Sequence, residues 1–192
     1  MSPNRRLLWL ATIGTVLIAA GSITWVLWPR PPWGVWEVAC VGRLHNLWLV
    51  LGDTVLSSKE MPISDEVSRR GSELNAVLAL RQHLSGRLGE FRCLAYAHDH
   101  GSEGINESYR MPDWTREQWK RAGHFKLELR YVPSPWQDRY SAPVIWDTEP
   151  VHNGTRNVLF YHGAIRRRVP EEIFQQLRKA SEESVRGETA HP

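Results

Sequence analysis

The sequence predicts an α+β fold: an N-terminal transmembrane helix, further amphipathic helices packed on a small antiparallel β-sheet, and a short C-terminal helix. Three observations support this prediction. Residues 7–28 carry no charged side chain, apolar residues recur every three or four positions over 33–57, and apolar and polar residues alternate from Phe125 onward. The first pattern is typical of a membrane span, the second of an amphipathic helix and the third of a half-buried strand.

The uncharged stretch is long enough to cross a membrane. As a helix, residues 7–28 span about 33 Å, which covers the hydrocarbon core of a bilayer. Arg5 and Arg6 precede it, so the positive-inside rule places residues 1–6 in the cytoplasm and the following domain, residues 33–182, outside it. We therefore expect a single-pass protein whose residues 7–28 contact membrane lipid.

A cleaved signal peptide is the alternative to a lasting anchor. Ala19, Ala20 and Gly21 form a tolerable cleavage site. However, the apolar run continues to Trp28, and it exceeds the roughly 7 to 15 residues of a signal peptide's apolar region. Either interpretation places the rest of the chain outside the cytoplasm.

Helical patterns follow the proline-rich break at residues 29–32. A second helix is expected over 33–57, with one apolar stripe made of Trp33, Trp36, Cys40, Leu44, Leu47, Trp48, Leu51 and Val55. A further helix is expected from an N-cap at Ser64 to about Leu84, and residues 97–113 are expected to form a loop.

Strands are expected where the apolar period becomes two. They cover four segments: 125–131, 142–146, 157–161 and 164–169. His162-Gly163 is the expected turn between the last two. Pro170 can begin a final helix. Its backbone has no N–H, but the N–H groups in the first turn of a helix have no acceptor within the helix anyway. Residues 183–192 are expected to form a flexible polar tail.

The composition excludes several classes of protein. The formal net charge is +3 over 192 residues, which is too small for a nucleic-acid-binding footprint. With 42% hydrophobic and 23% charged residues, the chain can bury a core. Phosphate-binding glycine loops, dinucleotide fingerprints and nucleophile elbows do not occur in the sequence. We therefore expect no cofactor, no nucleic-acid partner and no enzymatic activity.

The chain has two cysteines, Cys40 and Cys93. In an oxidising compartment a disulfide between them would close a loop of about 50 residues and stabilise the fold by about 4 kcal/mol. Two buried free thiols are the alternative. The sequence leaves both open.

Two segments resemble a known group of proteins. Ala39–Leu51, where a cysteine precedes an Asn-Leu turn, is similar to the segment after the membrane helix of type II secretion pseudopilin-like proteins. Trp146–Gly163 resembles the C-terminal motif of the prepilin-type-processing-associated proteins, which is a His, nine residues and then Asp-Gly. Here His152 begins the motif, and His162-Gly163 stands where those proteins have Asp-Gly.

The resemblance implies a pseudopilin-like domain held at a bacterial inner membrane with its C-terminal part in the periplasm. It implies a non-enzymatic role through contacts with other envelope or secretion-system proteins, linked to type II secretion or a pilus-like assembly. The motif residues are then structural braces of a terminal β-hairpin: His152, Arg156, Asn157, His162 and Gly163.

Two other functions remain open at this point. His98, Asp99 and His100 are the candidate metal ligands of an anchored periplasmic hydrolase, and His152 with His162 is a second histidine pair for such a site. Exposed tryptophans would instead suit an anchored glycan-binding module, because indole rings stack on apolar faces. Sequence shows pairs of ligands only, whereas a metal needs three or four that converge.

Overall fold

The computed structural model describes residues 33–53, 67–84, 87–101, 107–128, 136 and 139–187. The chain divides into two units, residues 1–33 and 34–192, and the described residues belong almost entirely to the second. The expected membrane span at 7–28 and its flanks at 1–6 and 29–32 lie outside the described residues, so that span stays a prediction. Among the helices that are described, none is both long and apolar enough to cross a bilayer.

The predicted α+β class is confirmed. The helices are α2 (Trp33–Leu51), α3 (Ala76–Ala79), α4 (Leu94–His100), α5 (Arg116–Ala122) and α6 (Glu171–Arg186), with short 3₁₀ turns η2 (Arg81–His83) and η3 (Leu88–Phe91). The strands are β1 (Arg69–Arg70), β2 (Glu73–Asn75), β3 (Tyr109–Pro112), β4 (Leu127–Glu128), β5 (Arg139–Tyr140), β6 (Pro143–Asp147), β7 (Thr155–Phe160) and β8 (Ile165–Pro170). Six strands form one sheet in the order β1-β2-β3-β6-β7-β8, and every neighbouring pair is antiparallel. β4 and β5 pair separately.

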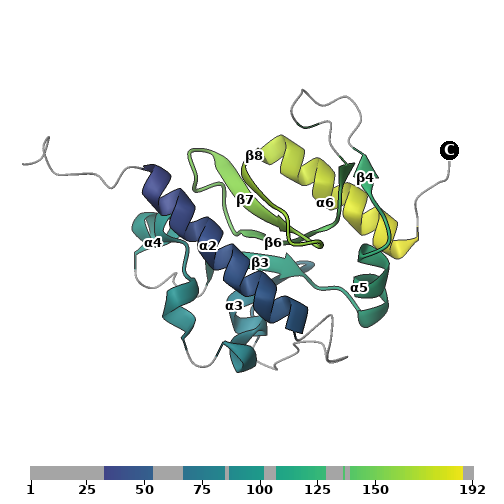
Figure 1. Ribbon diagram of the computed structural model, residues 1–192, viewed down its shortest axis with the longest axis horizontal. Helices are drawn as coiled ribbons and strands as arrows, with labels where there is room; N and C mark the ends of the chain where they lie inside the picture. The colour runs from purple at the N-terminus through teal and green to yellow at the C-terminus, as the bar shows by residue number, and fades with distance from the viewer. Residues whose placement is uncertain are drawn as a thin grey trace, which may run out of the picture. The chain divides into compact units, whose positions relative to one another are not determined.

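The central strands of the main sheet, β6 and β7, are buried on both faces. Figure 1 shows α2 and α6 on different sides of it. Because successive side chains of a strand point to opposite faces, Ile145 packs in the cluster that contains α2, while the next residue, Trp146, packs against Phe174 of α6. The two helices therefore bury two separate cores, and β6 and β7 lie between them.

The second predicted helix is confirmed as far as the structure describes it. α2 runs from Trp33 to Leu51, a π turn continues through Asp53, and the remaining positions to 57 lie outside the described residues. The predicted stripe is its buried face, where Cys40, Leu44 and Leu47 are fully buried.

The prediction of one continuous helix from Ser64 to about Leu84 is wrong over residues 67–75, and helix is found only in the short α3 and the 3₁₀ turn η2. The first part of the described range forms strands β1 and β2, joined by a turn in which Gly71 has φ +63°, and the short helix α3 and the 3₁₀ turn η2 follow them. The apolar spacing of Leu74 and Val77 fits a helix locally, but β2 gains backbone hydrogen bonds by pairing with β3. Tertiary pairing thus outweighs a short-range helical pattern.

The boundaries predicted for the loop at 97–113 are also wrong. α4 extends to His100, and β3 begins at Tyr109 inside the sheet. The C-terminal helix is confirmed, but it runs beyond the expected start of the tail at residue 183, since Val185 is buried and the helix ends at Gly187 in a left-handed cap.

The last three expected strands are confirmed as β6, β7 and β8, with ends that differ by one or two residues from those predicted. Of the strand expected over 125–131, the structure describes residues 127–128 as β4.

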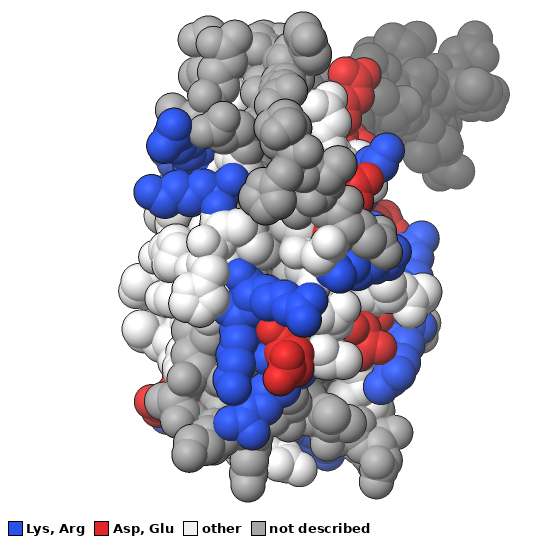
Figure 2. Space-filling view, turned by 90° about the vertical axis from the view of Figure 1, so that its right-hand side faces the viewer, with Lys and Arg blue, Asp and Glu red and all other residues white. Residues whose placement is uncertain are grey.

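Charges of both signs cover the end of the molecule where α5 lies and α6 ends. Figure 2 shows acidic side chains set beside basic ones on this face. Along α6 the pairs are Arg178 with Glu182, Lys179 with Glu183 and Arg186 with Glu182. Exposed pairs of this kind contribute little stability, so this face is a solvated mixed surface.

The start of α5 offers a clean test of local structure. Thr115 and Gln118 form a reciprocal capping box, in which Thr115 Oγ1 accepts from the Gln118 N–H and Gln118 Oε1 accepts from the Thr115 N–H. Thr115→Ala is expected to lower the free energy of unfolding by about 1 kcal/mol. Lys120→Ala, at an exposed site of the same helix, is the control and should change it by less than about 0.5 kcal/mol. Urea denaturation of the two variants checks this, and equal effects would contradict it.

Candidate functional site

The motif segment Trp146–Gly163 forms the end of β6, a turn, β7 and the start of a tight hairpin. The turn is built as the Asn-Gly dipeptide suggests: Asn153 has φ +60° and Gly154 has φ +77°. The His152 N–H donates to the Thr155 carbonyl, which closes the turn at the first residue of β7. This geometry directs the His152 side chain into the protein, where it is 5% exposed.

His152 meets both cysteines in a buried cluster. Its Nε2 lies 3.4 Å from Cys93 Sγ and 3.4 Å from Asp147 Oδ2. Cys93 Sγ lies 3.1 Å from Cys40 Sγ, and both thiols are free. We call Cys40, Cys93, Asp147 and His152 the cysteine–histidine cluster. It joins α2, the N-cap of α4, the end of β6 and the turn before β7, segments that lie far apart in the sequence.

Burial and mutual contact shift the acidities in the cluster. Burial raises the pKa of Asp147 to about 7, against the opposing effects of His152 and the Asn157 N–H. Burial would lower the pKa of His152, but its contacts with Cys40 and Asp147 outweigh this and raise it. The contact with Cys93 lowers the pKa of Cys40, and the same contact raises that of Cys93. Cys40 is therefore the more acidic thiol.

Arg156 braces the same turn from the other side. Its guanidinium is 9% exposed, donates to the Asp147 and Thr148 carbonyls, and forms an ion pair with Glu171 at the start of α6. Burial would raise the pKa of Glu171, but the hydrogen bonds from Arg156 and Gln175 outweigh it and lower the pKa. The Asn157 N–H donates to Asp147 Oδ2 at 2.6 Å. Both motif residues thus hold the end of β6 against β7 and α6.

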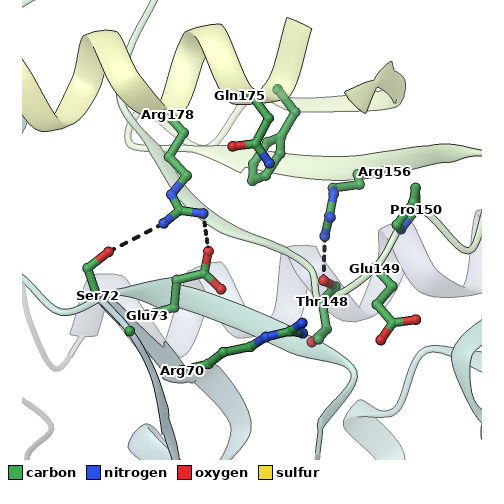
Figure 3. A pocket seen from close by; sticks show the side chains of 11 residues that line it. Arg70, Ser72, Glu73, Thr148, Glu149, Pro150, Arg156, Gln175 and Arg178 are labelled. Carbon is green, nitrogen blue, oxygen red and sulfur yellow. Dashed lines mark hydrogen bonds and ion pairs between the residues drawn. The ribbon is translucent and has the colours of Figure 1, made fainter. Parts of the chain in front are cut away.

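A polar pocket of about 540 Å³ opens beside Arg156. Figure 3 shows that Arg156 points to Thr148, and that Arg178 points to Glu73 and Ser72 across the pocket. Since these contacts occupy the Arg156 and Arg178 guanidinium groups, the pocket wall is an ion-pair network that ties α6 to β2 and β6. Such networks are common structural features.

The other motif residues lie at the hairpin turn. Gly163 has φ +83°, and a Cβ at this position would lie 2.8 Å from Trp48 Nε1 of α2. His162 is exposed, with its ring edge-on to Tyr161 and its N–H donating to Ser141 Oγ. His152 lies away from residue 162 and faces Asp147 and Cys93. His152 and His162 therefore do not form a ligand pair.

His98, Asp99 and His100 are exposed at the end of α4 and separate into different contacts. His98 contacts Asp99 and lies against the ring of Trp36, with centroids 4.9 Å apart. His100 stacks on Tyr96 and pairs with Glu149 at 3.3 Å. Within the described parts of the chain, the group of three residues able to share a metal ion is instead Cys40, Cys93 and His152.

Sequence reasoning missed Asp147. The signal was present in its position, since an acid directly follows the apolar run of β6 and precedes a turn. Its full burial could not be inferred, because burial depends on how α2 and β7 close over it.

Comparison with known proteins adds no relative: no family model, no characterised protein and no solved structure matches this chain.

Proposed function

We propose that this protein is a membrane-anchored, non-enzymatic, pseudopilin-like envelope protein that acts through protein–protein contacts, and that it pairs with a second copy of itself along α2. The observation that supports this is an apolar stripe on the outer face of α2. Val35, Val38 and Leu49 are 57%, 63% and 58% exposed, unlike the other large hydrophobic residues in the described parts of the chain.

The stripe has the spacing of a helix–helix seam. Val35, Val38, Gly42, His45 and Leu49 follow one another at intervals of three and four, and all five are exposed. Such a heptad pattern packs against the same pattern on a second helix. A Cβ added at Gly42 would meet no other atom within 4 Å, so a partner backbone can approach closely there. The inner face of the same helix is already used by the core.

The position of α2 in the chain supports pairing between copies. The helix directly follows the proposed membrane span, separated from it by residues 29–32. Two copies anchored in one membrane present α2 in the same orientation and at a high effective concentration. Parallel pairing then brings each stripe against its equivalent.

The motif residues support a structural role for the rest of the domain. His152, Arg156 and Asn157 are buried and engaged in holding β6, β7 and α6 together. Gly163 lies against Trp48 of α2, so the hairpin also supports the helix that carries the stripe. The secretion or pilus-like assembly itself is inferred from the resemblance of the two sequence segments.

Self-association through the stripe can be tested with the full chain in detergent micelles. The double variant Val38→Glu, Leu49→Glu is expected to weaken self-association at least about tenfold, because burying each side chain contributes roughly 1.5–3 kcal/mol. Its free energy of unfolding should stay within about 0.5 kcal/mol of the parent, since both sites are exposed. Sedimentation equilibrium measures the association and urea denaturation the stability.

The matched control is Gln82→Glu, Gln176→Glu, at exposed positions of η2 and α6, which adds the same charge elsewhere. It should leave self-association unchanged. A parent protein that remains monomeric at every concentration, or equal weakening by both double variants, would refute pairing through α2.

A further inference from the structure

The cysteine–histidine cluster has the composition and spacing of a metal site. Cys40 Sγ, Cys93 Sγ and a ring nitrogen of His152 lie within 4.8 Å of one another, and all three residues are buried. Asp147 Oδ2 lies 3.4 Å from the same nitrogen that faces Cys93. Two sulfurs and one imidazole nitrogen therefore converge on one small volume, and the Asp147 carboxylate lies beside the nitrogen.

Hydrogen bonds alone satisfy this arrangement poorly. His152 Nε2 offers either one proton or one lone pair, yet Cys93 Sγ and Asp147 Oδ2 approach it at equal distances of 3.4 Å. For the nitrogen and the carboxylate oxygen, 3.4 Å exceeds the usual range of a hydrogen bond. Asp147 Oδ1 is buried and has no hydrogen-bond partner among the described residues.

A tetrahedral ion fits the two distances at His152. Zinc binds sulfur at about 2.3 Å and nitrogen or oxygen at about 2.0–2.2 Å, so its ligand atoms lie roughly 3.3–3.8 Å apart. The two 3.4 Å separations fall in this range, whereas the sulfurs, 3.1 Å apart, have to separate by small side-chain rotations to bind the ion. In addition, the Leu94 N–H donates to Cys40 Sγ, a contact that stabilises a thiolate.

We propose that Cys40, Cys93 and His152 bind one zinc ion, and that the Asp147 carboxylate beside His152 turns toward it to complete the four ligands. Two thiolates and an imidazole select zinc over the hard cations magnesium and calcium. The site is closed: both cysteines are fully buried, which is typical of a structural ion rather than a catalytic one. Asn157 supports it from outside, because its N–H holds the Asp147 carboxylate.

The zinc would tie together three parts of the fold that lie far apart in the chain: α2, the start of α4 and the β6–β7 turn. Its role is separate from self-association, because the cluster lies on the inner side of α2 and the stripe on the outer side. The two proposals can therefore fail independently.

The test uses the full chain, with thiols alkylated at the moment of membrane lysis. Elemental analysis of protein purified from membranes is expected to find about one zinc ion per chain. Cys40 and Cys93 should resist alkylation until a chelator is added. Replacing zinc with cobalt should produce the visible absorption bands of tetrahedral thiolate coordination, which report the ligands directly.

Cys93→Ser and His152→Ala are expected to lose most of the bound zinc, whereas His124→Ala, at an exposed histidine, should retain it. If the ligand variants fail to fold, the cobalt spectrum of the parent protein still decides the question. A peptide linking Cys40 to Cys93 through a disulfide in the membrane-derived protein would overturn the proposal, as would free thiols with substoichiometric zinc.

Discussion

Arg156→Met is expected to lower the free energy of unfolding by about 3 kcal/mol, the largest loss that we anticipate from a motif side chain. The buried guanidinium donates to two backbone carbonyls, at Asp147 and Thr148, and pairs with Glu171. Removing it leaves both carbonyls without this donor, and each buried hydrogen bond to a charged group is worth about 1.5–3 kcal/mol. Glu171 is partly exposed and regains water, which limits the loss.

Methionine is chosen because it keeps an apolar stem against the ring of Phe174, over which the Arg156 guanidinium lies at 4.9 Å. The control is Arg167→Met on β8, where the side chain is exposed and the change should stay within about 0.5 kcal/mol. Urea unfolding followed by tryptophan fluorescence measures both variants. A loss below about 1 kcal/mol for Arg156→Met would show that Arg156 is not a brace.

Gly163→Ala is expected to lower the free energy of unfolding by about 2–5 kcal/mol for two separable reasons. Its φ of +83° is a left-handed conformation that costs an L-residue roughly 1–2 kcal/mol. The new Cβ would also lie 2.8 Å from Trp48 Nε1 and displace the indole from the hairpin, an overpacking cost of about 1–3 kcal/mol. The motif glycine is therefore required both by the turn and by the helix that packs on it.

Gly154→Ala separates the two reasons. Gly154 has a similar φ of +77°, but nothing lies within 4 Å of its Cβ position, so only the backbone cost of about 1–2 kcal/mol applies. In a Trp48→Ala background the two glycine substitutions should cost nearly the same, and this double-mutant cycle isolates the contact between hairpin and helix. An unchanged difference in that background would mean that Trp48 is not the obstacle.

Local pattern and tertiary contact contribute differently to the motif. The Asn153-Gly154 and His162-Gly163 turns can be read from the dipeptides, because positive φ is a property of the residues themselves. The partner of His152, in contrast, cannot be read from the sequence. His152 and His162 belong to the same motif, but His152 lies on the inner side of its turn and faces Asp147, whereas His162 is exposed.

In the segment around Leu74, the local pattern predicts the wrong secondary structure. Its residues have helical spacing and a good N-cap at Ser64, yet the chain forms β1 and β2 there. A helix of this length is marginal without packing, and pairing with β3 supplies backbone hydrogen bonds that the spacing does not reveal. Whether so short a segment becomes a helix or a strand therefore depends on the segments that pack against it.

The order of amino acids is enough to predict the α+β class, helices α2 and α6, and the C-terminal hairpin with its turns, because each depends on a period or a dipeptide within a few residues. It is not enough to show that Cys40, Cys93, Asp147 and His152 share one buried volume, or that α2 keeps an apolar stripe on its outer face. Those features follow from which segments pack together and which faces they leave uncovered. Residues so distant in the chain carry no local pattern that specifies this packing.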